Sequence, residues 1–309
     1  MSRFKPILLC LLLGACAGGV EWRRDWELGG RALSRGRLAE AEPALDAALA
    51  RAQGFGPNDP RLAASLNALG DLRMAQGAPS KAEKLYRRAL VILEKRHGPD
   101  APETAAAVAD LAAACAASGK EEEAARLLRR ALASAEKDPK RHAEAAARLA
   151  DLAALQRARG KEDEAAAAYR RALAITEKAL GPSSRFTADR LTDLALFHHA
   201  RGDFAEADDF YQRALAVKEK VLGPGHPETE AALNDLALFY EAQEKLDEAE
   251  ALYRRAVDQL EKAHGKSSPR LAGTLGHYAH LLRRRGRGDQ AAGLERRARA
   301  LIHREKAPR

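Results

Sequence analysis

One sequence pattern recurs seven times along the 309 residues of this chain, and it limits the possible folds more than any other feature. Each copy contains a short polar turn, and the turn residues, 41 or 42 positions apart, are Gly36, Gly77, Gly119, Gly160, Gly202, Glu244 and Gly286. Alanine stands five positions after every turn, at Ala41, Ala82, Ala124, Ala165, Ala207, Ala249 and Ala291. Seven copies in one register indicate a repeat protein, in which contacts are made mainly between neighbouring copies.

The copy at residues 233–256 indicates what one repeat folds into. Before its turn, apolar residues stand at helical spacing, at Leu233, Leu236, Ala237 and Tyr240. After the turn the same spacing returns at Ala249, Tyr253 and Ala256. Such spacing places apolar side chains on one face of a helix. The pattern therefore predicts a hairpin of two helices along one buried seam, with Ala237 and Ala249 where the helices approach most closely.

The second copy resembles the tetratricopeptide repeat, through Leu66, Leu69, Gly70, Ala82 and Tyr86. The long period, and the Gly-Pro pairs at 98–99, 181–182 and 223–224, are similar to the repeats of kinesin light chains and their bacterial relatives. The resemblance covers roughly residues 21–302. It implies an all-α fold: an α-solenoid of about seven helix-turn-helix repeats over residues 21–309, forming a curved superhelix.

Some copies depart from the pattern. In the last copy Glu295 and Arg299 replace apolar seam residues, which is typical of a capping repeat whose outer face meets water. The loop at residues 137–140 is short, so we expect a different stacking angle there. Asp59-Pro60 and Ser268-Pro269 predict helix starts, because a capping residue precedes proline at the first helical position.

The first fifteen residues read as a secretory signal peptide. Arg3 and Lys5 precede a short apolar stretch, Ile7–Leu13, which is too short to span a bilayer. The following residues, 13–16, resemble the lipobox of bacterial lipoproteins, in which the signal is removed before a cysteine that receives lipid. We therefore expect lipid on Cys16 and a short linker over residues 16–20; the alternative is a plain secretion signal with an incidental cysteine.

This resemblance also implies a location. Several acyl chains on Cys16 would hold the protein stably on a membrane. Ala17 stands where an Asp would resemble the retention signal of the inner membrane, so we expect the bacterial cell envelope, with the outer membrane facing the periplasm favoured. Trp22 and Trp26 have two interpretations: they enter the lipid interface, or they cover the first seam.

The charge pattern suggests a second kind of partner. The formal net charge is +8, and charges of both signs alternate on the predicted helices, which is typical of solvated helix surfaces. Only the stretch Arg283–Arg309 is strongly basic, with ten Arg or Lys and three acidic residues. That end could bind an anionic envelope polymer or lipid headgroups, or it could be a soluble cap. Because no aromatic residue interleaves these charges, we expect no nucleic-acid partner.

The resemblance to tetratricopeptide arrays implies a concave groove, lined by the first helix of each hairpin, that binds a protein or peptide. Carried over by position, its lining includes Asn67, Asp71, Met74, Arg157, His199, Asn234, Glu241, His280 and Arg283. Alanines fill these positions in the middle repeats, so the centre would be shallow and apolar. Asn67 and Asn234 match the asparagine with which this family holds a peptide backbone, because one amide group offers both a donor and an acceptor. The alternative for each residue is plain helix surface.

The sequence contains no catalytic motif that we could identify, so we expect no enzyme activity, no cofactor and no metal site. His277 and His280 stand one helical turn apart, but we expect His280 on an exposed face. Cys115 falls on a seam position equivalent to Tyr240, so it is predicted to be a buried small side chain. The prediction as a whole is a lipid-anchored scaffold or adaptor that binds another protein.

Overall fold

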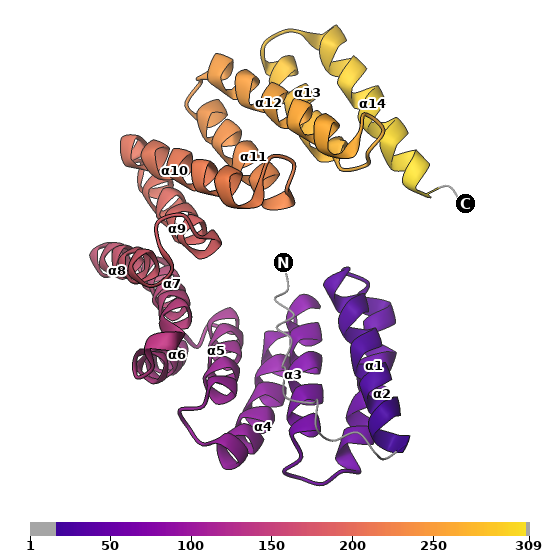
Figure 1. Ribbon diagram of the computed structural model, residues 1–309, viewed down its shortest axis with the longest axis vertical. Coiled ribbons are helices and arrows are strands. Elements are labelled where there is room, and N and C mark those ends of the chain that lie inside the picture. Colours follow the sequence, from indigo (N-terminus) through magenta and orange to yellow (C-terminus); the bar gives the residue numbers. More distant parts are fainter. Residues whose placement is uncertain (1–16, 307–309) are drawn as a thin grey trace. The chain divides into compact units, whose positions relative to one another are not determined.

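A computed structural model describes residues 17–306 of the chain. Over this range the structure is all-α, with fourteen α-helices, one short 3₁₀ turn and no strand (Figure 1). The α-helices are α1 (Ala17–Ser34), α2 (Leu38–Gln53), α3 (Pro60–Ala75), α4 (Pro79–His97), α5 (Pro102–Ala117), α6 (Glu121–Glu136), α7 (His142–Ala158), α8 (Glu162–Leu180), α9 (Arg185–Arg201), α10 (Phe204–Leu222), α11 (Pro227–Ala242), α12 (Leu246–His264), α13 (Leu271–Arg284) and α14 (Gly288–Lys306). The predicted signal peptide and Cys16 lie outside the described residues.

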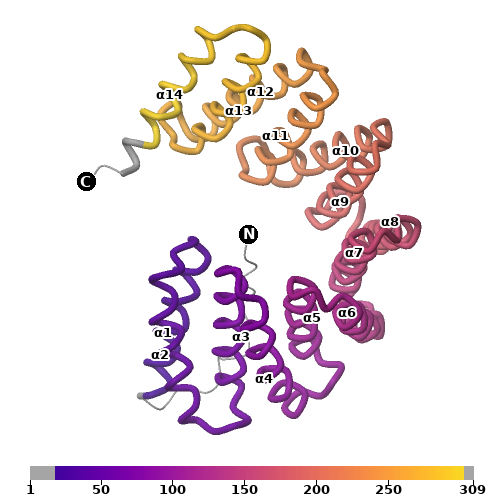
Figure 2. Tube along the Cα trace, turned by 180° about the vertical axis from the view of Figure 1, so that it is seen from behind, coloured from indigo at the N-terminus to yellow at the C-terminus, as the bar shows by residue number. Residues whose placement is uncertain are grey.

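Consecutive helices form the predicted hairpins. Odd-numbered helices are the first helices of the repeats and even-numbered helices are the second, and the same pairs are visible from the opposite side in Figure 2. The chain divides into two compact units, Met1–Ala168 and Tyr169–Arg309, here called unit 1 and unit 2, with the boundary inside α8. Within each unit the second helix of one hairpin packs against the first helix of the next, as α2 does on α3 and α10 on α11. Each unit is therefore a stretch of α-solenoid.

The alanines of the repeat lie at the closest approach of the helices, as predicted. All seven residues five positions after the turns are fully buried: Ala41, Ala82, Ala124, Ala165, Ala207, Ala249 and Ala291. A larger residue nine positions after the turn, such as Tyr86 or Tyr253, fills the adjacent space and is also buried. Small and large side chains thus alternate along each seam, which allows close helix packing.

Unit 1 contains a continuous apolar core that runs from the first hairpin to the fourth. It includes Trp22, Leu66, Tyr86 and Leu111. The indole of Trp22 is 3% exposed, and its Nε1 donates a hydrogen bond to Ser65 Oγ at 2.9 Å. Trp22 therefore covers the first seam, and its insertion into a lipid interface is excluded in this structure.

The core of unit 2 is richer in aromatic side chains. Tyr211 and Phe239 pack with their ring centroids 5.1 Å apart. Phe239 also meets the imidazole of His199 at 5.0 Å in an edge-to-face arrangement. Such aromatic pairs contribute beyond the area that they bury. The apolar core continues to the last hairpin through Leu260, Leu271 and Leu301.

Most turns use glycine for one physical reason. The six turn glycines have φ between 70° and 84°, the left-handed region that glycine enters without steric cost. Glu244 replaces glycine in the sixth repeat and still has φ of 59°. A side chain in this region costs about 1 kcal/mol or more. An ion pair between Glu244 and Arg284, at 2.6 Å, accompanies this strained conformation.

The position of a residue in the repeat does not settle burial or helix starts everywhere. Leu28 occupies the repeat position of the buried Leu69 and Leu236, but its side chain is 54% exposed, because no described helix before α1 packs on it. Asp59 caps α3 as predicted, whereas Ser268 does not cap a helix at Pro269, since α13 begins at Leu271. The short loop after α6 contains the 3₁₀ turn Pro139–Arg141. Asp138 caps this turn, because its side chain accepts a hydrogen bond from the backbone N–H of Lys140.

None of the helices described over residues 17–306 has the combination of length and apolar character that crossing a bilayer requires.

Candidate functional site

In unit 1 the predicted groove residues Asn67, Asp71 and Met74 lie on α3 and are all partly buried. Met74 packs against the apolar core. The Oδ1 atom of Asn67 is buried, and no hydrogen-bond partner for it occurs among the described residues. Arg157 lies on α7 and is exposed. Among the predicted groove residues of unit 1, Asn67 is therefore the one whose side-chain oxygen is buried without a hydrogen-bond partner in the described residues.

Asp71 is held by the hairpin itself. The Tyr86 hydroxyl of α4 donates a hydrogen bond to Asp71 Oδ1 at 2.7 Å. Burial, and then the nearby charge of Asp110, raise the pKa of Asp71 to about 7, although the Tyr86 hydrogen bond lowers it. The same burial raises the pKa of Tyr86 well above its ordinary value. Sequence reasoning assigned Asp71 to peptide contact and did not foresee its bond to Tyr86.

Unit 2 presents a different first-helix face. Leu196 of α9 and Leu238 of α11 occupy equivalent repeat positions and are 51% and 42% exposed. His199 lies one turn after Leu196 on α9, and its Nδ1 is 3.4 Å from the Tyr211 hydroxyl. Burial raises the pKa of Tyr211 to about 12, with a smaller effect from Asp235. Their repeat position puts both leucines in the predicted groove, but the sequence alone does not show that they are exposed.

Asn234 lies on α11, one turn before Leu238. Its Nδ2 atom is 3.4 Å from Thr274 Oγ1 of α13, a long hydrogen bond. Its Oδ1 atom is buried without a partner in the part of the chain that the structure describes. Asn67 and Asn234 thus share one feature in two separate units, a buried amide oxygen without a hydrogen-bond partner among the described residues. We call Leu196, His199, Asn234 and Leu238 the leucine–asparagine face of unit 2.

Of the predicted groove residues Glu241, His280 and Arg283, only His280 has the exposed surroundings that were expected for it without an ion pair of its own at short distance, whereas Glu241 is buried and Arg283 is paired. Glu241 is only 4% exposed, and it accepts hydrogen bonds from the Tyr253 hydroxyl at 3.0 Å and from Arg284. Its carboxylate therefore connects two repeats and is unavailable to a bound chain. His280 is exposed and lies 3.5 Å from Glu241, and Arg283 pairs with Glu295 at 2.8 Å. The structure thus assigns Glu241 to the core.

Sequence reasoning missed a set of acidic residues six positions after the turns. They accept hydrogen bonds from the following repeat, and they are Glu42, Glu83, Asp208 and Glu250. Glu250 is the most buried, and burial alone would raise its pKa, but Arg287, Tyr278 and Arg254 lower it below the ordinary value. The common spacing was the available signal, yet the sequence cannot show which side chains of the next repeat meet these acids.

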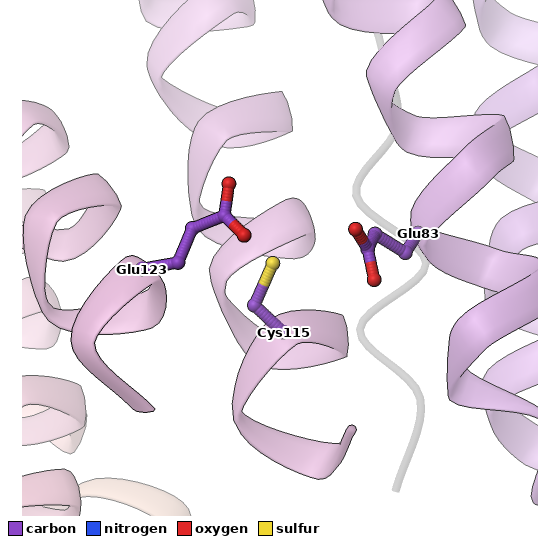
Figure 3. A group of neighbouring side chains, drawn as sticks. All are labelled: Glu83, Cys115 and Glu123. Carbon is purple, nitrogen blue, oxygen red and sulfur yellow. The ribbon is translucent and has the colours of Figure 1, made fainter. Parts of the chain in front are cut away.

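One cluster within residues 17–306 has the composition of a metal site. Ligand atoms of Glu83, Cys115 and Glu123 lie within 4.8 Å of one another, with the thiol directed between the two carboxylates (Figure 3). Lys120 already binds Glu83 at 2.8 Å, and Arg87 binds Glu123 at 2.7 Å. Burial and the two acids raise the pKa of the Cys115 thiol to about 11. The donor set therefore fits an ion-pair network better than a cation, and Cys115 is a buried small side chain, as predicted.

The basic end is less available than its composition indicates. Five of its arginines bind acidic residues, in the pairs Arg283–Glu295, Arg284–Glu244, Arg285–Asp247, Arg287–Glu250 and Arg297–Glu261. A polymer or lipid headgroup would have to compete with these carboxylates. Exposed ion pairs contribute little to stability, but they reduce the positive potential of the surface.

Comparison with known proteins identifies the type of repeat. Models of the tetratricopeptide repeat match residues 26–95, 71–137, 145–185, 187–228 and 228–302. Among solved structures, the nearly identical TPR-like repeats of a kinesin light chain from Podosopora anserina are 27% identical, with a TM-score of 0.55 over 65% of this chain and 95% of that one. Aspartyl phosphate phosphatase F from Bacillus subtilis is 14% identical, with a TM-score of 0.61 over 92% of this chain and 71% of that one, and it shares the fold alone. No curated protein matches this sequence.

Proposed function

Because the chain belongs to the tetratricopeptide repeat family and its repeats are of the kinesin-light-chain type, we propose that it is a protein-binding scaffold anchored in the bacterial cell envelope. Proteins with this repeat generally mediate protein–protein interaction, and the fold is typically a non-catalytic scaffold. The leucine–asparagine face of unit 2 carries the proposal. Two exposed leucines at equivalent positions, beside a buried amide oxygen without a partner, suit a bound protein segment.

The contacts of such a segment follow from this face. Apolar side chains of the partner would cover Leu196 and Leu238, and full burial of one leucine contributes about 1.5–3 kcal/mol. The Oδ1 atom of Asn234 is buried in the free protein, so a backbone N–H of the partner would donate to it once the amide group turns outward. Leaving such an acceptor unmatched costs about 1–3 kcal/mol, so its pairing favours the complex.

Replacing Leu238 by Ser is expected to weaken partner retention by about tenfold or more, since about 1.4 kcal/mol corresponds to a factor of ten. Val221, on α10, is the matched control: it is 41% exposed, close to the 42% of Leu238, but lies on a second helix. Val221→Ser should leave retention unchanged. A partner is first identified by cross-linking through position 238. The affinity of each purified variant for that partner is then measured. Equal losses in both variants would contradict the assignment of this face.

The anchor is proposed from the sequence alone: a signal-like stretch ending in a lipobox at Cys16. Cys16→Ser is expected to abolish incorporation of a labelled fatty acid and to move the protein from the membrane fraction to the soluble fraction. Wild-type protein should resist a high-salt wash, because acyl chains hold by burial of apolar surface. Release by salt would instead indicate attachment through the basic end, whose charge interactions are screened. If the Cys16→Ser variant carries no fatty-acid label but stays in the membrane fraction, the proposed lipid anchor is wrong.

A further inference from the structure

One side of α1 in unit 1 carries exposed arginine and aliphatic side chains. These residues, here called the arginine stripe, are Val20, Arg24, Leu28, Arg31 and Arg35, the last in the turn that follows α1. Their spacings of 4, 4, 3 and 4 residues place the side chains along one side of a helix. Val20 is 67% exposed, Leu28 is 54% exposed, and the Arg24 side chain is 70% exposed. The buried Trp22 and Leu33 lie on the other side of α1, which packs against α2 and α3.

The stripe is positive because two acidic residues of α1 turn towards α2 instead. Glu21 and Asp25 both bind Arg51 of α2, Asp25 at 2.8 Å. Arg24, on the stripe, reaches Asp25 only at 3.4 Å. Since Asp25 is already satisfied by a closer guanidinium, Arg24 keeps most of its capacity to bind an anion.

The other two arginines of the stripe are less occupied still. Arg31 Nε donates to the backbone oxygen of Glu27 at 3.3 Å, and the Glu27 side chain is exposed at the edge of the stripe. Among the described residues, no carboxylate forms an ion pair with Arg31 or Arg35. A guanidinium group matches the geometry of a phosphate, which it can bind through two parallel hydrogen bonds.

An acidic lipid surface fits this composition better than a second copy of the chain. Lipid phosphates would bind the arginines, while Val20, Leu28 and the aliphatic stems of the arginines enter the boundary below the headgroups. In a two-fold contact of the stripe with itself, arginine would face arginine. The stripe also begins only four residues after Cys16, which the proposed function places at the membrane.

We propose that the arginine stripe lays α1 flat on a membrane surface that contains acidic phospholipid. The proposal rests on the lipid anchor of the proposed function, which holds the amino end of α1 at the membrane, and it adds an orientation. A rise of about 1.5 Å per residue puts Ser34 about 26 Å from Ala17. An upright α1 would hold Ser34 that far from the lipid, whereas a flat α1 holds it close.

A fluorophore at position 34 of the full-length lipidated protein measures this orientation. Ser34→Cys provides an exposed thiol, whereas Cys115 is buried and does not compete for the label. The protein is placed on vesicles of phosphatidylcholine, with or without phosphatidylglycerol, that carry a quencher on the lipid headgroups. Quenching should be strong only with phosphatidylglycerol and should fall at high salt, because charge attraction is screened. Equal quenching on both kinds of vesicle overturns the proposal.

A triple variant tests the arginines of the stripe. It combines Arg24→Gln, Arg31→Gln and Arg35→Gln. Each arginine near an acidic surface contributes about fivefold to the ratio of flat to upright protein. That ratio, obtained from the quenched fraction, is therefore expected to fall at least tenfold in this variant.

The matched control removes three exposed charges from α4 of the same unit. It combines Lys84→Gln, Arg88→Gln and Lys95→Gln, beside Val91, which is 64% exposed. The ratio should stay at its wild-type value. Equal losses in the two triple variants would mean that unit 1 is attracted by its overall charge, and the assignment to α1 would be wrong.

Flotation of the same vesicles tests the anchor separately. Lipidated wild type and both triple variants should float with either kind of vesicle, at low and high salt, because the acyl chains are unchanged. If the wild type does not float with phosphatidylcholine alone, the anchor is wrong, and flotation with phosphatidylglycerol then tests the stripe directly. In that case, flotation that only the stripe variant loses supports the stripe, and flotation that is absent, or lost equally in both variants, overturns it.

Discussion

Replacing Tyr253 by Ala is expected to lower the free energy of unfolding of unit 2 by about 4 kcal/mol or more, through a cavity and a lost hydrogen bond. Tyr253 is fully buried and packs against Ala237, Ala249 and Leu281, so its ring touches three helices. Its hydroxyl also donates to the buried Glu241 at 3.0 Å. Denaturant unfolding, followed by hydrogen exchange in α11, α12 and α13, measures the loss.

Tyr253→Phe separates the two contributions. The ring stays in place, so the remaining loss, about 1–3 kcal/mol, reports the unmatched acceptor on Glu241. A Tyr253→Ala variant that loses less than about 2 kcal/mol would show that the seam can collapse around the missing ring, against the packing described here.

Gly70→Ala is expected to destabilise unit 1 by about 2 kcal/mol, because the new methyl group has no space. A Cβ atom at this position would lie 2.4 Å from Tyr86 Cε1 and 2.7 Å from Cζ. The Tyr86 ring would have to withdraw, and its hydrogen bond to Asp71 would be lost. The loss is limited, since Ala237 occupies the same position opposite Tyr253 in unit 2, where the two side chains fit.

The matched control is the same substitution at an open position. Gly273 lies in α13, and nothing stands within 4 Å of a Cβ built on it. Gly273→Ala should therefore stabilise the helix by about 0.5–1 kcal/mol, through helix propensity alone. Opposite signs for the two variants, in thermal or urea unfolding, are the expected result. A stabilised Gly70→Ala variant would mean that Tyr86 does not pack on the α3 backbone.

Local spacing was enough to predict the hairpins. The alanines after each turn and the glycines in the turns report short-range requirements, namely the close approach of two helices and a left-handed backbone. The same rules do not decide burial, since Leu28 is 54% exposed whereas Leu69 and Leu236, at the same repeat position, are buried. They also left two interpretations for Trp22, the lipid interface and the first seam. Its hydrogen bond to Ser65, 43 residues away, places it at the seam.

The candidate site was predictable only in part. Position in the repeat identified Asn67 and Asn234, and both carry a buried amide oxygen without a partner within residues 17–306. The same reasoning placed Glu241 and Asp71 among exposed contacts, where the structure gives them internal hydrogen bonds. A helix position fixes the direction of a side chain, but not which residue of the partner helix lies opposite to it.

The sequence by itself determined that this chain is a series of paired helices, because the seams and turns depend on residues only three to twelve positions apart. Only the tertiary structure decided which charges are used between the repeats. Glu83 pairs with Lys120, and Glu250 pairs with Arg287. Both contacts join residues 37 positions apart, and they exist only once the helices have packed, when the removal of water makes the partner of each carboxylate decide its charge.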